Sequence, residues 1–172
     1  KGVALGELAR WEHLDELVAY AVQRQIVALL ASNDVVLTKV DIPPGAARQF
    51  DSMLPYLVED EVAQDVDNLH FTVLDKQAEA AQVCAVERAW IQTILQRFSS
   101  QGLVIKRMLP DVLAMPVDEE SSSAVQLGEQ WLIRHSQTQG AVVDASGLDL
   151  YLSTYLQSNE SWKRGCDRSA SD

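Results

Sequence analysis

The fold of this chain is decided by one stretch, which reads Met53-Leu54-Pro55-Tyr56-Leu57-Val58-Glu59-Asp60-Glu61-Val62-Ala63-Gln64-Asp65-Val66. Its apolar residues recur at spacings of three and four, which predicts a helix with one apolar side. Between Asp51 and Asp67 the polar side carries six carboxylates and no lysine or arginine. Such a helix packs on its own domain with one side and offers a negative surface to a basic partner with the other.

The start of this helix is marked by Pro43-Pro44-Gly45, which ends the preceding strand, so a helix is expected from about Ala46. We expect it to bury Phe50, Met53 or Leu54, Leu57, Val58 and Val62. Pro55 lacks an amide hydrogen and crowds the carbonyl four residues earlier. Either the helix kinks there or a second helix begins there. We expect a second helix with Pro55 in its first turn, where proline is tolerated.

Strand-like and helical runs interleave on both sides of this stretch. Gly102 is placed to cap the clearest helix, and Gly128-Glu129 is placed to turn a hairpin. The interleaving predicts an α/β or α+β class with a mixed sheet. Helices are expected over 7–22, 87–100 and 148–156, and strands over 26–31, 35–42, 69–75, 82–87, 103–106, 124–127, 131–135 and 141–144.

The overall charge of the chain limits its partners. At 172 residues, with 47% apolar and 23% charged residues, the composition is that of a globular protein with one domain or two small lobes. The formal net charge is -11, which argues against nonspecific binding of nucleic acid, whose phosphates repel such a surface. A basic protein is the better electrostatic match.

The two cysteines, Cys84 and Cys166, form no disulfide framework, so a reducing cytosol is the expected compartment. No window approaches eighteen consecutive apolar residues, and no signal peptide is recognisable, so neither a membrane span nor a leader is expected within this chain. The chain begins with Lys1 rather than methionine, which is consistent with a piece of a longer protein.

The motifs of common catalytic and metal sites are missing from the sequence. Glu59-Asp60-Glu61 lacks the alternating ligands and the glycine of a calcium loop. His13, His70 and His135 show no zinc-ligand spacing, and Cys84 lies in an apolar run where burial raises a thiol pKa. We therefore expect no catalytic residue, no cofactor and no metal.

Four blocks occur in an order and spacing that resemble the cytoplasmic part of the type II secretion system protein L family. They are Ile42-Pro43-Pro44-Gly45-Ala46, residues 53–66, Leu109-Pro110-Asp111-Val112-Leu113-Ala114-Met115-Pro116 and Leu127-Gly128-Glu129-Gln130-Trp131-Leu132. The resemblance implies an actin-like, ribonuclease-H-like α/β fold of mixed sheets with helices, present here as a partial domain. It also implies a single transmembrane helix and a periplasmic domain in the full protein.

What the resemblance implies for function is a scaffold, not an enzyme. It would be the cytoplasmic domain of a single-pass bacterial inner-membrane protein that recruits the secretion ATPase (protein E) through the N-terminal domain of that ATPase. The full-length protein would also contact protein M and other platform components. A homodimer through a sheet edge is left open.

The expected partner-binding residues are Tyr56, Glu59, Asp60, Glu61 and Asp65. The carboxylates would pair with arginines or lysines of the ATPase, and the Tyr56 ring would anchor the contact. The segment around Asp111 and the hairpin at Gly128 are competing locations. We expect an actin-like core formed by 1–33 and 76–156, a β-α-β interaction subdomain with the acidic helix over 34–75, and a polar tail over 157–172.

Two other functions stay open. Actin-like folds often bind ATP, which needs glycine-rich phosphate loops. The candidates here, Leu127-Gly128-Glu129 and Asp144-Ala145-Ser146-Gly147, have one glycine each. A nucleotide-binding ATPase or switch that uses these turns is the alternative to the scaffold, and a soluble adaptor without a membrane anchor is the third reading.

Overall fold

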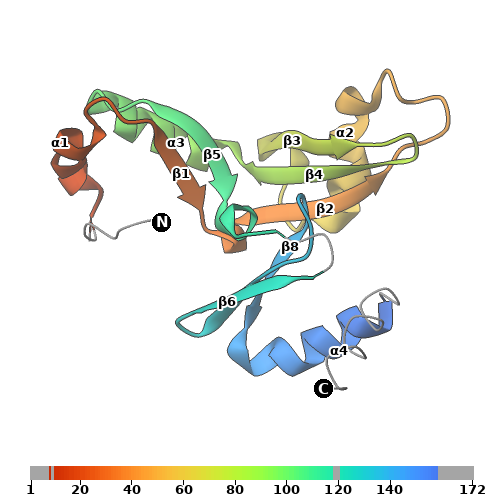
Figure 1. Cartoon of the computed structure of the whole chain (residues 1–172). Coiled ribbons are helices and arrows are strands. Elements are labelled where there is room, and N and C mark those ends of the chain that lie inside the picture. The colour runs from red at the N-terminus through yellow and green to blue at the C-terminus, as the bar shows by residue number, and fades with distance from the viewer. Residues whose placement is uncertain (1–7, 9, 118–120, 159–172) are drawn as a thin grey trace.

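A computed structural model of the chain describes residues 8, 10–117 and 121–158 (Figure 1). The strands in these ranges are β1 (Ile26–Leu30), β2 (Val35–Asp41), β3 (Leu69–Lys76), β4 (Ala80–Glu87), β5 (Ile105–Pro110), β6 (Ser123–Leu127), β7 (Gln130–Arg134) and β8 (Gly140–Asp144). The helices are α1 (Val18–Ala21), α2 (Phe50–Val58), α3 (Arg88–Ser100) and α4 (Leu148–Ser158).

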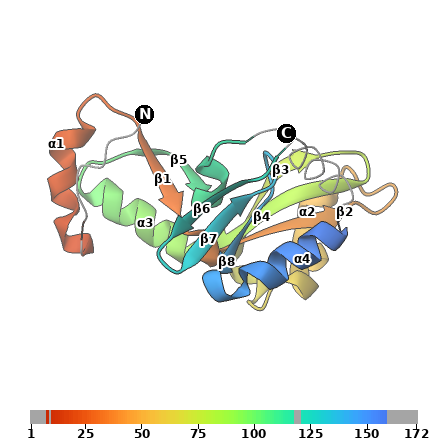
Figure 2. The same cartoon turned by 60° about the horizontal axis from the view of Figure 1, so that its bottom comes forward.

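The described residues form three separate small sheets, and each has a helix nearby (Figure 2). β1 pairs with β5 in parallel, β4 lies between β2 and β3 in an antiparallel sheet, and β7 lies between β6 and β8 in a second antiparallel sheet. In Figure 1 the β1–β5 pair and the β2-β4-β3 sheet extend in opposite directions from a shared junction, and the third sheet lies below it.

The main hydrophobic core lies between α2 and one face of the β2-β4-β3 sheet. Phe50, Leu54 and Val58 repeat every four residues on α2 and are at most 3% exposed, so one side of the helix is buried along its whole length. They pack against strand residues such as Val40 and Val83. Burying a side chain of this size stabilises the fold by about 1.5–3 kcal/mol.

A single helix runs through Pro55, so the prediction of a second helix starting there is wrong. The three buried residues of α2 must all reach the same sheet, and this holds the helix to one axis on either side of the proline. The proline ring nitrogen forgoes one backbone hydrogen bond, the one that would reach Asp51. The helix also begins later than expected, because Ala46 and Gln49 donate to the carbonyls of Pro43 and Ala46 in consecutive turns.

The parallel pair β1–β5 is covered on one face by α3. Leu30, Val86 and Ile94 form the buried centre of this second core. Gly102 ends the segment after α3 with a φ of 71°, as its place in the sequence predicts. The sequence spacing predicts that Trp90, Ile91, Ile94, Leu95 and Phe98 share the buried side of this helix. Leu95 is an exception, because it is 42% exposed.

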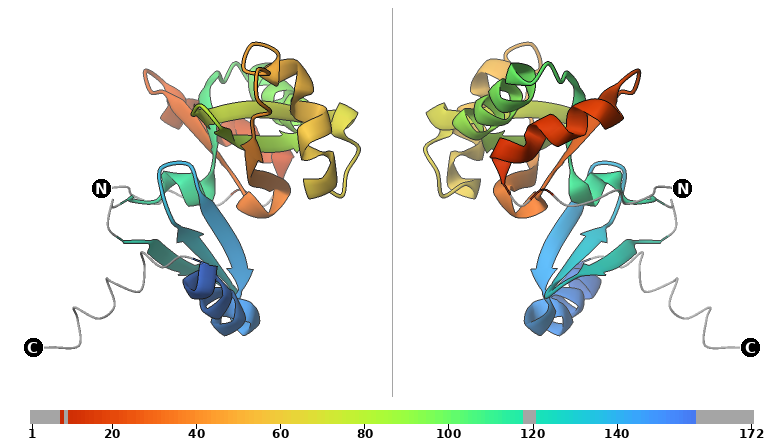
Figure 3. Two further views of the ribbon diagram at one scale, coloured as in Figure 1. Left: turned by 90° about the vertical axis from the view of Figure 1, so that its right-hand side faces the viewer. Right: turned by 90° about the vertical axis from the view of Figure 1, so that its left-hand side faces the viewer.

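The third sheet is a meander that carries α4 after it. Gly128 turns the β6–β7 hairpin with a φ of 60°, a backbone conformation that favours glycine. His135, just after β7, stacks on Tyr155 with 3.9 Å between the ring centroids. Its Nε2 lies 2.6 Å from the hydroxyl of Tyr151, and its Nδ1 lies 2.9 Å from the hydroxyl of Ser122. The contacts with Tyr151 and Tyr155 hold α4 against the third sheet, and Figure 3 shows the helix lying beside this sheet.

Two short 3-10 turns, Ser32–Asp34 and Asp111–Ala114, join the sheets. Both follow the carboxyl ends of the parallel strands β1 and β5. The Asp111 carboxylate accepts hydrogen bonds from the amide and hydroxyl of Ser32 and from the amide of Val112. The two bonds from Ser32 connect residues that are 79 apart in the sequence and fix the two turns to each other.

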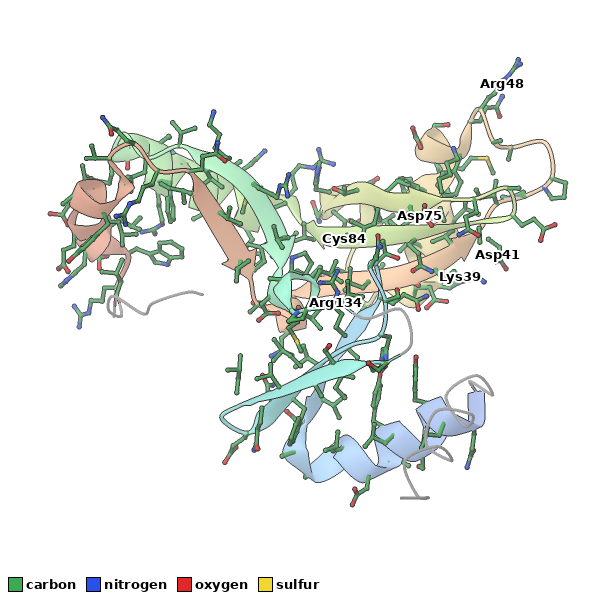
Figure 4. All side chains as sticks on the ribbon, in the orientation of Figure 1. Lys39, Asp41, Arg48, Asp75, Cys84 and Arg134 are labelled. Carbon is green, nitrogen blue, oxygen red and sulfur yellow. The ribbon has the colours of Figure 1, made fainter. Side chains whose placement is uncertain are left out.

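Arg134 closes the same junction on the side of the third sheet (Figure 4). Its guanidinium donates to the backbone carbonyls of Met115, Ser136 and Gln137. A planar guanidinium with five donors is suited to gathering several carbonyls at one point.

The element types expected from the sequence otherwise agree with the structure, with shifted bounds. The first predicted helix consists of a 3-10 turn over Trp11–Leu17 followed by the short α1. Strands β1 and β2, separated by one tight turn, belong to different sheets. The polar tail expected from residue 157 lies outside the described residues except for its first two positions. The division into a core and a 34–75 subdomain stays a prediction, although β4, the centre of the second sheet, comes from residues after 75.

Candidate interaction surface

The acidic stretch does not continue the helix as the sequence pattern predicts. α2 ends at Val58, which is fully buried, and Glu59–Glu61 form a 3-10 turn. Val62 follows in an extended conformation and packs on the α2 core. Because buried Val58 and partly buried Val62 hold the turn at its two ends, its three consecutive acidic side chains are left exposed.

The other two predicted site residues lie on either side of this turn. Tyr56 belongs to α2 and is 76% exposed, the highest value among the large apolar side chains of the described residues. Asp65 caps the next turn, since its carboxylate accepts a hydrogen bond of 3.0 Å from the amide of Asp67. The five residues therefore share one exposed segment, and the structure joins no pair of them by a hydrogen bond or ion pair.

The carboxylates of this segment have no basic partner within the described part of the chain. The ion pair found there joins His13 to Glu16, far away in the sequence. Ionised carboxylates only accept hydrogen bonds, so the segment can receive lysine, arginine or amide donors from another molecule. We name the segment from Tyr56 to Asp65 the acidic segment.

A hollow of about 240 Å³ lies where the acidic segment returns to the second sheet. Gln64 lines it, together with Leu69, Trp90 and two carboxylates that sequence reasoning did not select, Asp34 and Glu87. Knowledge of the β2–β4 pairing would have drawn attention to them. Val35 pairs with Val86, so Asp34 and Glu87 both lie at this end of the two strands.

A second hollow of about 370 Å³ lies between β2 and β8, which are edge strands of two different sheets. Asn33 lines both hollows, and its side-chain amide donates to Gln130 at 2.8 Å. Gln130 in turn donates to Asp144 at 3.2 Å, so a chain of polar side chains links the turn after β1 to the third sheet.

The residues considered for other chemistry are placed as follows. Burial raises the pKa of the Cys84 thiol to about 11, which keeps it protonated at neutral pH. Burial also lowers the pKa of His135. The turns at Gly128 and Gly147, the nucleotide candidates, line neither of the two hollows described above. Within the described ranges, no three histidine, cysteine or acidic side chains gather as metal ligands would.

Comparison with known proteins identifies the family. The family model of type II secretion system protein L matches residues 1–163. The chain belongs to the type II secretion system protein L family. This family was the one that the four sequence blocks resemble, so that prediction is confirmed.

Individual protein L sequences and one solved structure support the same assignment. The chain is 50% identical to the protein L of Vibrio cholerae over 158 residues, which are 92% of this chain and 39% of that protein. It is 33% identical to the protein L of Klebsiella pneumoniae over 72% of this chain and 31% of that protein. The chain thus spans less than half the length of these two relatives. Their names describe a component of a secretion system, and neither names a reaction.

The solved structure is the cytoplasmic domain of EpsL, an inner-membrane component of the type II secretion system of Vibrio cholerae. It matches with a TM-score of 0.80 at 52% sequence identity, over 87% of this chain and 63% of that domain. The predicted actin-like α/β fold class is confirmed by this match. Within the described ranges of the present chain, no helix combines the length and apolar content that a membrane span requires.

Proposed function

We propose that this chain is part of a cytoplasmic scaffold at the inner-membrane platform of a type II secretion system, where it binds the secretion ATPase, protein E. Its membership of the protein L family carries the assignment to this system. The full-length protein would hold the scaffold at the membrane and contact protein M and other platform components. Tethering would raise the effective concentration of the ATPase at the platform.

The observation that carries the ATPase-binding part is the acidic segment itself. It follows directly on the α2 core and exposes Tyr56 and four carboxylates, and these carboxylates have no basic partner among the described residues. We assign Glu59, Asp60, Glu61 and Asp65 to pairing with lysines or arginines of the ATPase. Tyr56 is the apolar anchor, since tyrosine is common among the residues that dominate interface affinity.

In this arrangement the carboxylates govern the rate of association more than the final affinity. An exposed ion pair contributes only about 0–1 kcal/mol. A surface patch that carries only negative charges, however, attracts a basic partner over a distance and raises the association rate. Dissolved salt screens this attraction. The scaffold therefore captures the ATPase quickly and orients it, and Tyr56 slows its release.

The test is the association rate between the ATPase N-terminal domain and a double variant, Glu59→Lys with Glu61→Lys. At low ionic strength we expect association roughly tenfold slower than for the unchanged chain, with a flatter dependence on salt. The control is Glu129→Lys with Asp149→Lys, which changes the net charge equally at exposed sites outside the acidic segment.

Equal slowing by the two double variants would show that net charge alone matters. Slowing by the control only would move the contact to the surface that carries Glu129 and Asp149. Either result removes the acidic segment from the interface.

A further inference from the structure

We draw no further inference here: the strongest candidate, the face of the β1–β5 pair on which Val27 and Leu29 are 51% and 54% exposed, is an unpartnered apolar face, and nothing in the structure shows what covers it.

Discussion

Replacing Gly140 by alanine tests the packing between the third sheet and the turn Asp111–Ala114. A Cβ atom added at Gly140 would lie 2.6 Å and 2.9 Å from the two methyl groups of Val112, and 3.1 Å from the carbonyl oxygen of Ile133. Carbon atoms in contact prefer about 3.5–4.0 Å. Val112 is fully buried, so it cannot turn away into solvent.

The expected cost follows from this overlap of about 1 Å. Overpacking of a buried site typically costs about 1–3 kcal/mol. For a chain of this length each kcal/mol lowers the melting temperature by about 2–4 °C, so Gly140→Ala should melt roughly 2–12 °C lower. The matched control is Gly147→Ala, whose added Cβ would lie 3.8 Å from Val143, an ordinary contact.

A double-mutant cycle shows whether Val112 is the cause. Val112→Ala alone should cost about 1–2 kcal/mol, because it removes two buried methyl groups. It also removes the two methyl groups that lie nearest to an added Cβ at position 140. The double variant should therefore be more stable than the sum of the single effects predicts. Thermal unfolding followed by circular dichroism measures all four proteins. Additive effects, or equal losses for Gly140→Ala and Gly147→Ala, would refute the packing argument.

Two further predictions concern titrating groups. Burial lowers the pKa of His135 from 6.5, so between its folded and unfolded pKa values the unfolded chain binds more protons. The free energy of unfolding should therefore fall as the pH drops below about 6.5. His135→Gln should make this free energy depend less on pH in urea unfolding series between pH 7.5 and about 5.5. An unchanged pH dependence would count against the burial of His135. Burial raises the pKa of Cys84 to about 11, so in a Cys166→Ser background Cys84 should react with a thiol reagent at pH 8 at least about a hundredfold more slowly than an unfolded control. Rapid labelling of the folded chain would show that β4 is open to solvent.

The α2 core could be predicted from the sequence because the residues that reveal it lie close together along the chain. The apolar spacing of Phe50, Leu54 and Val58 identifies the buried side of the helix. The prediction was wrong at Pro55. The sequence shows that a proline costs a helix one backbone hydrogen bond, but it does not show the sheet that holds α2 straight, because that sheet is built from residues before and after α2. The acidic residues were correctly expected to be exposed, but a helical pattern cannot show that the helix stops at Val58.

Long-range pairing was the part that the sequence could not supply. β1 and β2 read as neighbouring strands, yet β1 pairs with β5, which begins 75 residues after β1 ends. The hollow at Asp34 was missed for the same reason. Asp34 lies in an unremarkable polar turn, and only its pairing context brings it beside Glu87 and Trp90. Whether the predicted partner-binding residues bind the ATPase stays a prediction.

The junction at Asp111 has a mechanical consequence. The three sheets of the described residues share no ladder of backbone hydrogen bonds, so their relative placement depends on the turns at Ser32 and Asp111, on the side-chain bonds between them, and on the second core, to which β1 and β4 both contribute. Losing these contacts would change the orientation of the sheets to one another while the pairing within each sheet stayed in place.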